Sequence, residues 1–167
     1  MDAQQTLPQP LSSNLSVANS ITCFGVCDGV IVSNTIGGTA PFTYSWNTGA
    51  TSSSINNLCP GLYSVNIVDA NGCTTSGSIS MGQPQQLIIL LISSIDATCG
   101  QCNGTAAVSA IGGTPPYTYG WSNGGTTQVI NNVCAGVYGA VVTDANGSLA
   151  TTSVGVSNTN AEIVNIT

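Results

Sequence analysis

The chain has 167 residues, of which six are charged, all of them acidic, and it contains no Lys, Arg or His. Charged residues make up 4% of this chain, against about 25% in a typical soluble protein. The missing cations argue against nucleic acid as a partner, because phosphate is bound by cations, and the missing His removes the commonest general base and metal ligand. We therefore expect no enzyme.

The first 20 residues form a polar segment with Pro8 and Pro10, a spacing that precludes a helix and favours an extended strand. We expect residues 1–20 to be an extended tail that can donate a strand to another copy. No basic and apolar leader is recognisable, so the numbering is interpreted as that of a mature, processed form. Together with the C-terminal strand expected at 163–167, this tail supplies the candidate subunit-interface residues, which are Thr6, Leu7, Pro8, Leu11, Leu15, Val17, Ile163 and Ile166.

The next segment alternates apolar and small polar residues, which predicts strands. Residues 29–36 are a β-branched run, and Phe42, Tyr44 and Trp46 alternate with polar residues, so these aromatic side chains are expected on the core face of one strand. Residues 63–67 alternate again and end at residues 69–72, where Asn-Gly supplies a tight hairpin turn.

Residues 82–84 mark a boundary, and residues 87–92 then form the longest apolar run of the chain. Six residues are far fewer than the roughly 18 that a membrane span needs, so no membrane insertion is expected. This run is interpreted as the buried first strand of a second domain.

From residue 112 the sequence repeats at an offset of 75. Residues 37–72 and 112–147 align without a gap, and 19 of the 36 positions are identical. Short strands every 8–12 residues with Gly, Pro and Asn turns are typical of β-sandwiches. We predict an all-β fold of two tandem Ig-like β-sandwich domains, with the extended tail at 1–20, the first repeat at 21–84 and the second at 85–167.

The seven cysteines suggest an oxidising, extracellular location. Cys27 and Cys59 recur as Cys102 and Cys134 with the same spacing, which predicts two disulfides, and Cys23–Cys73 is predicted as a third. Cys99 is then unassigned: a buried thiol, an intersubunit bridge and an alternative pairing with Cys102 all remain open. A redox or zinc site is disfavoured, because neither a βαβ unit nor four N/S ligands are present.

The turns at Asp69 and Asp144 resemble part of a calcium loop, but the further oxygen ligands of such a loop are absent. Turn chemistry explains them, and weak calcium binding is the alternative, so no cofactor is expected. Trp46 and Trp121 are expected in the core rather than in a sugar-stacking platform. Candidate glycosylation sequons begin at Asn14, Asn103, Asn146 and Asn165.

The motifs Gly37-Gly38-Thr39-x-Pro41-Phe42-Thr43-Tyr44-Ser45-Trp46, Pro60-Gly61-x-Tyr63 and Asp69-Ala70-Asn71-Gly72-Cys73, together with Cys23-Phe24-Gly25 and Asp28-Gly29, resemble the SprB-type repeat. The second repeat matches through residues 112–121, 136–138 and 144–147 but lacks the closing Cys. That family occurs in long arrays in cell-surface gliding adhesins of Bacteroidota. The resemblance implies an extracellular, Ig-like repeat with an adhesive or structural role.

Two functions follow as expectations. The first is an extracellular homopolymer, a filament whose subunits exchange the N-terminal strand, which the low charge and the unmatched termini favour. The alternative is a non-polymeric surface adhesin whose repeats bind glycans or surfaces.

Overall fold

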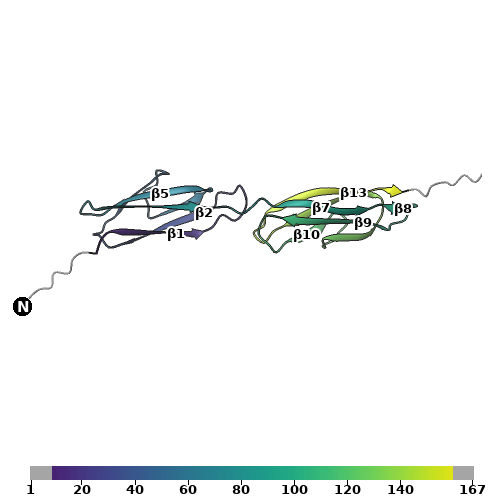
Figure 1. The fold of residues 1–167 in the computed structure, drawn as a ribbon, viewed down its shortest axis with the longest axis horizontal. Coiled ribbons are helices and arrows are strands. Elements are labelled where there is room, and N and C mark those ends of the chain that lie inside the picture. The colour runs from purple at the N-terminus through teal and green to yellow at the C-terminus, as the bar shows by residue number, and fades with distance from the viewer. Residues whose placement is uncertain (1–8, 160–167) are drawn as a thin grey trace, which may run out of the picture. The chain divides into compact units, whose positions relative to one another are not determined.

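The computed structural model describes residues 9–159, and its regular elements are all β-strands (Figure 1). The chain divides into two compact units between Gln83 and Pro84. The first unit contains β1 (Ser12–Asn19), β2 (Gly29–Ile36), β3 (Thr43–Trp46), β4 (Ser54–Leu58), β5 (Gly61–Val68) and β6 (Thr74–Met81). The second contains β7 (Ile88–Ile95), β8 (Ala97–Thr98), β9 (Gly104–Ile111), β10 (Thr118–Trp121), β11 (Val129–Val133), β12 (Gly136–Thr143), β13 (Leu149–Val156) and β14 (Asn158–Thr159).

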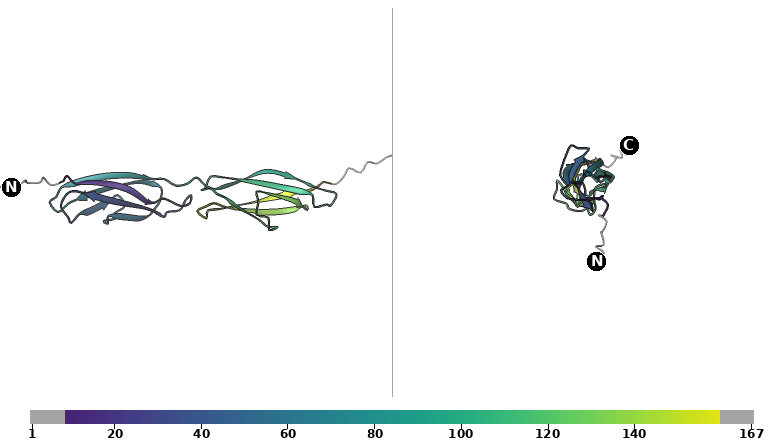
Figure 2. Two further views of the ribbon diagram at one scale, coloured as in Figure 1. Left: turned by 90° about the horizontal axis from the view of Figure 1, so that it is seen from below. Right: turned by 90° about the vertical axis from the view of Figure 1, so that its left-hand side faces the viewer.

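Each unit is a sandwich of two three-stranded sheets, as the views in Figures 1 and 2 show. The strand orders are β1-β2-β4 and β3-β5-β6 in the first unit, and β7-β9-β11 and β10-β12-β13 in the second, where a short parallel pair, β8 and β14, is added. The neighbouring strands of the four main sheets are antiparallel. The predicted all-β fold of two tandem Ig-like sandwiches is therefore confirmed.

The cores are built from the alternating residues that the sequence places on one face of each strand. In the first unit Trp46, Val65 and Ile67 are buried, with Phe42 and Tyr44 packed against them. In the second unit Trp121, Ala140 and Val108 are buried in the equivalent cluster. Burying an apolar side chain contributes roughly 1.5–3 kcal/mol, so these clusters supply the main stabilisation of two small domains.

β1 is part of the first sandwich rather than a separate tail. It pairs along its length with β2 of the same chain, from Ser12 opposite Ile36 to Asn19 opposite Val30. Leu15 packs against the first core, and β7 takes the corresponding place in the second unit. The expected segment 1–20 is thus corrected: residues 12–19 complete the fold of their own unit, since a sandwich without them would leave β2 as an open edge.

The apolar run at 87–92 differs from the expectation in its burial. Leu87 is buried at 7% exposure, but Ile88, Leu90, Leu91 and Ile92 are all exposed. β7 is an edge strand whose one hydrogen-bonded neighbour is β9, so one of its faces meets the core and the other is open. The expectation of a buried strand was wrong because a continuous apolar run reads the same whether its strand lies at the centre or the edge of a sheet.

The edge strands β4 and β11 each contain a bulge. β4 places Asn56 and Asn57 opposite the single residue Val30, and β11 inserts Asn132 between the pairs Asn131–Thr105 and Val133–Gly104. Asn57 and Asn132 have φ angles of 53° and 55°. Asn tolerates this left-handed conformation better than most residues, and the bulge twists the edge away from flat pairing.

Candidate functional site

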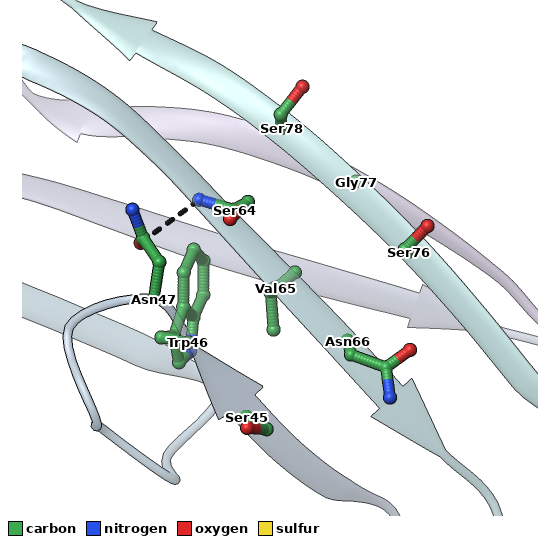
Figure 3. Close-up of a pocket in the computed structure, with 9 residues that line it drawn as sticks. All are labelled: Ser45, Trp46, Asn47, Ser64, Val65, Asn66, Ser76, Gly77 and Ser78. Atoms are coloured by element: carbon green, nitrogen blue, oxygen red, sulfur yellow. Dashed lines mark hydrogen bonds between the residues drawn. The ribbon is translucent and has the colours of Figure 1, made fainter.

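The outer face of the β3-β5-β6 sheet in the first unit carries a shallow hollow of about 540 Å³ (Figure 3). Its polar lining consists of Ser45, Asn47, Ser64, Asn66, Ser76 and Ser78. The register sets them side by side, since Ser45 lies opposite Asn66, Asn66 opposite Ser76, and Ser64 opposite Ser78. The hollow exists because the central positions of this face carry small side chains.

These residues point outward for the same reason that the aromatic residues point inward. Successive side chains of a strand alternate between faces, so the burial of Trp46 and Val65 turns Ser45, Ser64 and Asn66 to solvent. Sequence reasoning noted this alternation for the core and did not see that the polar partners of three strands gather into one surface. The signal was available: polar residues occupy every second position in residues 43–47 and 74–80 and at 64 and 66.

Most of the lining groups keep their hydrogen-bonding capacity. Asn47 is held in place, because its Oδ1 accepts from the backbone N–H of Ser64 at 3.1 Å and its Nδ2 donates to the carbonyl of Leu62 at 3.0 Å (Figure 3). Within residues 9–159, the side chains of Ser45, Ser64, Asn66, Ser76 and Ser78 make no hydrogen bond to another residue. The hollow therefore presents one fixed amide and several open hydroxyl and amide groups, without any charge.

The second unit has a different surface at the equivalent positions. Gly120 stands for Ser45, Gly139 for Ser64 and Val141 for Asn66, and the hollow there measures about 330 Å³. Val137, Val141 and Leu149 are exposed on this face. Ser122, Thr151 and Ser153 remain polar there, so the second unit keeps three of the six polar positions and lacks the other three.

The tryptophans lie in the cores, as predicted. Trp46 and Trp121 are 3% and 6% exposed, and each indole Nε1 donates to a loop carbonyl at 2.8 Å, that of Ser52 and that of Thr127 respectively. This placement removes the two indoles as sugar-stacking platforms.

Asp69 and Asp144 hold the turns at one end of each sandwich. Asp69 accepts hydrogen bonds from the backbone N–H groups of Thr39, Asn71 and Cys73 at 2.9, 2.9 and 2.8 Å. Burial acts to raise the pKa of Asp69, but the hydrogen bonds from Thr39, Cys73 and Asn71 outweigh it, so this pKa lies below its ordinary value of 3.8. These hydrogen bonds account for the position of Asp69 as turn chemistry, and weak calcium binding stays an untested alternative.

Asp144 repeats the arrangement with Thr114, Asn146 and Ser148 at 2.8, 3.0 and 2.8 Å. Here too burial acts to raise the pKa, and the hydrogen bonds from Thr114 and Ser148 bring it below 3.8. Within residues 9–159, no three His, Cys, Asp or Glu side chains are grouped so that they hold a metal ion. No helix in that range is long and apolar enough to cross a membrane.

Two of the three predicted disulfides are present, Cys27–Cys59 and Cys102–Cys134. The prediction of a Cys23–Cys73 bond was wrong. Cys23 lies in the loop before β2, near Gln83 after the end of β6, whereas Cys73 directly precedes β6. The eight residues of β6 separate these ends by roughly 25 Å, and a disulfide needs Cα atoms within about 7 Å. Cys99 is an exposed thiol.

The predicted glycosylation sites differ in their surroundings. The amide of Asn103 is engaged at both ends with Thr98, at 2.9 and 2.8 Å, and that of Asn146 donates to the Thr114 hydroxyl at 3.1 Å. Asn14 is exposed on the outer face of β1. Asn165 lies outside the described residues. Glycosylation stays a prediction, and the geometry favours Asn14.

The predicted interface residues divide into three groups. Leu11 and Leu15 pack within their own unit, Leu11 against Gly38 and Leu15 against the core. Val17 is exposed at 37%. The rest lie outside the described residues: Thr6, Leu7, Pro8, Ile163 and Ile166.

Comparison with protein-family models finds one family that matches this chain. The model of the SprB repeat matches residues 15–51 and again residues 92–126. The chain carries two tandem SprB repeats. The matches start in β1 and in β7, so the family repeat includes the first strand of each sandwich. The match is to a cell-surface repeat family.

No curated protein matches the chain. Among solved structures, a chain from work on Dscam isoform specificity has a TM-score of 0.42 at 11% identity, covering 92% of this chain and 47% of that one. A C-terminal fragment of intimin, solved in complex with the intimin-binding domain of its translocated receptor, has a TM-score of 0.44 at 12% identity, covering 89% and 65%. The two Ig domains of DIP-gamma give 0.43 at 11%, covering 90% and 98%. The chain thus spans about half of the Dscam chain and 65% of the intimin fragment.

Proposed function

We propose that the chain is an extracellular adhesive repeat module whose first unit binds neutral, hydroxyl-rich ligands such as surface polysaccharides. The observation that carries the proposal is the uncharged hollow of the first unit, with its open hydroxyl and amide groups. Such groups exchange hydrogen bonds with sugar hydroxyls, and the absence of any cation disfavours an anionic ligand. The SprB family supplies the cell-surface setting.

The chain offers its own matched control for this proposal. A triple variant, Ser45→Gly, Ser64→Gly and Asn66→Val, gives the first unit the residues of the second at these positions. These residues occur in the same fold, so the variant is expected to fold. On an array of neutral and acidic oligosaccharides, we expect the wild-type chain to bind neutral members and the variant to lose at least tenfold in affinity.

A control variant, Gly120→Ser with Val141→Asn, changes the second unit instead; it leaves the hollow of the first unit intact and is expected to bind neutral members at least as well as the wild-type chain. Absence of wild-type binding to every neutral member, or equal binding by the triple variant, contradicts the proposal.

A second candidate function is a surface filament formed by exchange of the N-terminal strand between copies. The observation in its favour is the edge position of β1, which has one hydrogen-bonded neighbour and is exposed over most of its residues. In the structure β1 pairs within its own chain, so exchange requires β1 to leave that site. The test is deletion of residues 1–20, followed by electron microscopy of the full and shortened chains. Filaments that persist after the deletion would exclude assembly by exchange of the N-terminal strand.

A further inference from the structure

The second unit has an apolar surface that the first unit lacks at the same positions. It lies on the outer side of the β7-β9-β11 sheet, where Ile88, Leu90, Ile95, Ile111 and Val129 are between 41% and 61% exposed. We call these five residues the β7 face. Figure 1 shows β7 beside β9 within this unit.

The register places the five residues on one side of the sheet. Ala106 and Val108 of β9 belong to the core, so residues 105, 107, 109 and 111 point outward. Ile111 lies opposite Ile88, Ser109 opposite Leu90, and Thr105 opposite Ile95. Val129 lies opposite Ala107 from the other side. The outward Ala107 is only 8% exposed, and Ser93, opposite it in the register, lies on the same side between Leu90 and Ile95.

The equivalent surface of the first unit, on the outer side of the β1-β2-β4 sheet, has a different composition. By register, the counterparts of Ile88, Leu90, Ile95 and Val129 are polar, and they are Ser12, Asn14, Asn19 and Ser54. Ile36 alone, the counterpart of Ile111, is apolar. Since the two units share one fold, the fold does not require apolar residues at these positions. Exposed clusters of apolar side chains rimmed by polar ones mark association surfaces.

We propose that the β7 face binds the β7 face of a second copy of this chain, and that the chain forms a two-fold dimer. The face carries no charge, and the nearest carboxylate, Asp96, accepts a hydrogen bond from the backbone N–H of Ser157 at 2.9 Å. Two such faces meet without like charges opposite each other, whereas a charged partner would find nothing to pair with. An open sheet face is also suited to face-to-face packing on another sheet.

Because only the second unit has the β7 face, the number of copies that can assemble through it is limited. A two-fold contact uses the same surface on both copies and leaves no second copy of that surface free. Because the first unit has polar residues at the equivalent positions, it offers no further docking site of this kind. The contact therefore stops at a dimer, which distinguishes it from polymerisation by strand exchange.

Sedimentation velocity over a concentration series tests the proposal. We expect monomer–dimer behaviour for the chain 1–167, with a dimer that persists or strengthens at high salt because no charge pair holds it. The double variant Ile88→Ser with Leu90→Asn introduces the residues of the first unit and is expected to raise the dimer Kd at least tenfold. The matched control Leu149→Thr removes an exposed Leu from the opposite sheet and is expected to leave the Kd unchanged.

Circular dichroism melting of each variant separates loss of dimer from loss of fold. A wild-type chain that stays monomeric up to about millimolar concentration overturns the proposal, and so does a series that continues beyond dimers. Equal weakening by Leu149→Thr and by the double variant also overturns it.

Discussion

The first strands of the two units, β1 and β7, occupy equivalent positions in their sandwiches. A leucine at the same register position is packed on the core in β1 and exposed in β7. Leu15 of β1 packs against the core, whereas its counterpart in β7, Leu91, is 57% exposed. The residue across the sandwich differs as well: Gly77 in the first unit is Thr152 in the second, each at the same register on its sheet. A Cβ added at Gly77 would lie 3.2 Å from the Leu15 Cδ1, so a side chain at this position requires the leucine to shift by a few tenths of an ångström.

This difference shows how two copies of one domain keep a common core and acquire different exteriors. Gly77, where the second unit has Thr152, is the difference in the opposite sheet that lies against this leucine. In β7 this leucine is not packed inside, and most of the apolar side chains of the strand are exposed on the surface of the unit. The following predictions test the cores, which should respond alike, and then the features in which the units differ.

The largest effect is expected from the core tryptophans. Trp46→Ala and Trp121→Ala should each destabilise their own unit by about 3–5 kcal/mol, because each leaves a cavity and an unpaired loop carbonyl. Hydrogen-exchange mass spectrometry reads each unit separately. Loss of protection in the unmutated unit would contradict two independent cores.

Removal of one disulfide should cost nearly as much. Cys27→Ser with Cys59→Ser opens a loop with a sequence separation of 32, and Cys102→Ser with Cys134→Ser opens one of the same separation. Each pair should lower the unfolding free energy of its own unit by about 3–4 kcal/mol on loop-closure grounds. Chemical denaturation checks the size, and a clear difference between the two pairs would show that loop length does not govern the effect.

The glycine at 77 should have an intermediate effect. Gly77→Thr brings the first unit to the residue of the second and should push Leu15 outward, at a cost of about 1–3 kcal/mol from overpacking. Ser78→Thr, on the outer face of the same strand, serves as the control and should change little. A Gly77→Thr chain as stable as the wild type would remove Gly77 as the cause of the difference.

The smallest effect is expected from the turn carboxylates, and it is a loss of stability that occurs only at acidic pH. The pKa values of Asp69 and Asp144 are lowered in the folded chain, so their stabilising contribution is present above the unfolded value, near 3.9, and is lost as the pH falls through the folded value. Melting temperatures of the wild type should therefore fall below about pH 5. Asp69→Asn should flatten this fall in the first unit and Asp144→Asn in the second.

A fall that survives the double change Asp69→Asn with Asp144→Asn would assign the acid sensitivity to other groups. Cys73→Ser gives the turn of the first unit the residue that the second unit has at position 148. This change should leave the dependence of melting temperature on pH unchanged.

The sequence predicted the parts of the fold that alternation and turn chemistry determine. The inward placement of Phe42, Tyr44 and Trp46 follows from a period of two, and the duplication correctly paired Cys27 with Cys59. The Cys23–Cys73 bond failed because spacing along the chain says nothing about which end of a sandwich a loop occupies. β1 was expected as a strand offered to another copy, whereas it pairs with β2 of its own chain; an extended segment has the same pattern in either case.

The candidate surfaces were harder to predict than the cores. The polar hollow depends on which three strands are neighbours, and sheet order is not visible in any one strand. The exposure of β7 depends on its place in the sandwich, opposite strands about 60 residues further along the chain. Both are pairwise properties of segments far apart in sequence, and a single periodicity carries no information about them.

The Asn bulges of β4 and β11 have a consequence for biosynthesis. Adjacent repeats with more than half of their aligned positions identical offer nearly interchangeable strands to each other while the chain emerges from the ribosome, and misassembly between neighbours is a characteristic failure of such arrays. A left-handed residue in each of these edges interrupts the flat ladder on which a strand from the other repeat would have to extend. At these two edges, Asn57 and Asn132 therefore disfavour pairing with a strand from the other repeat.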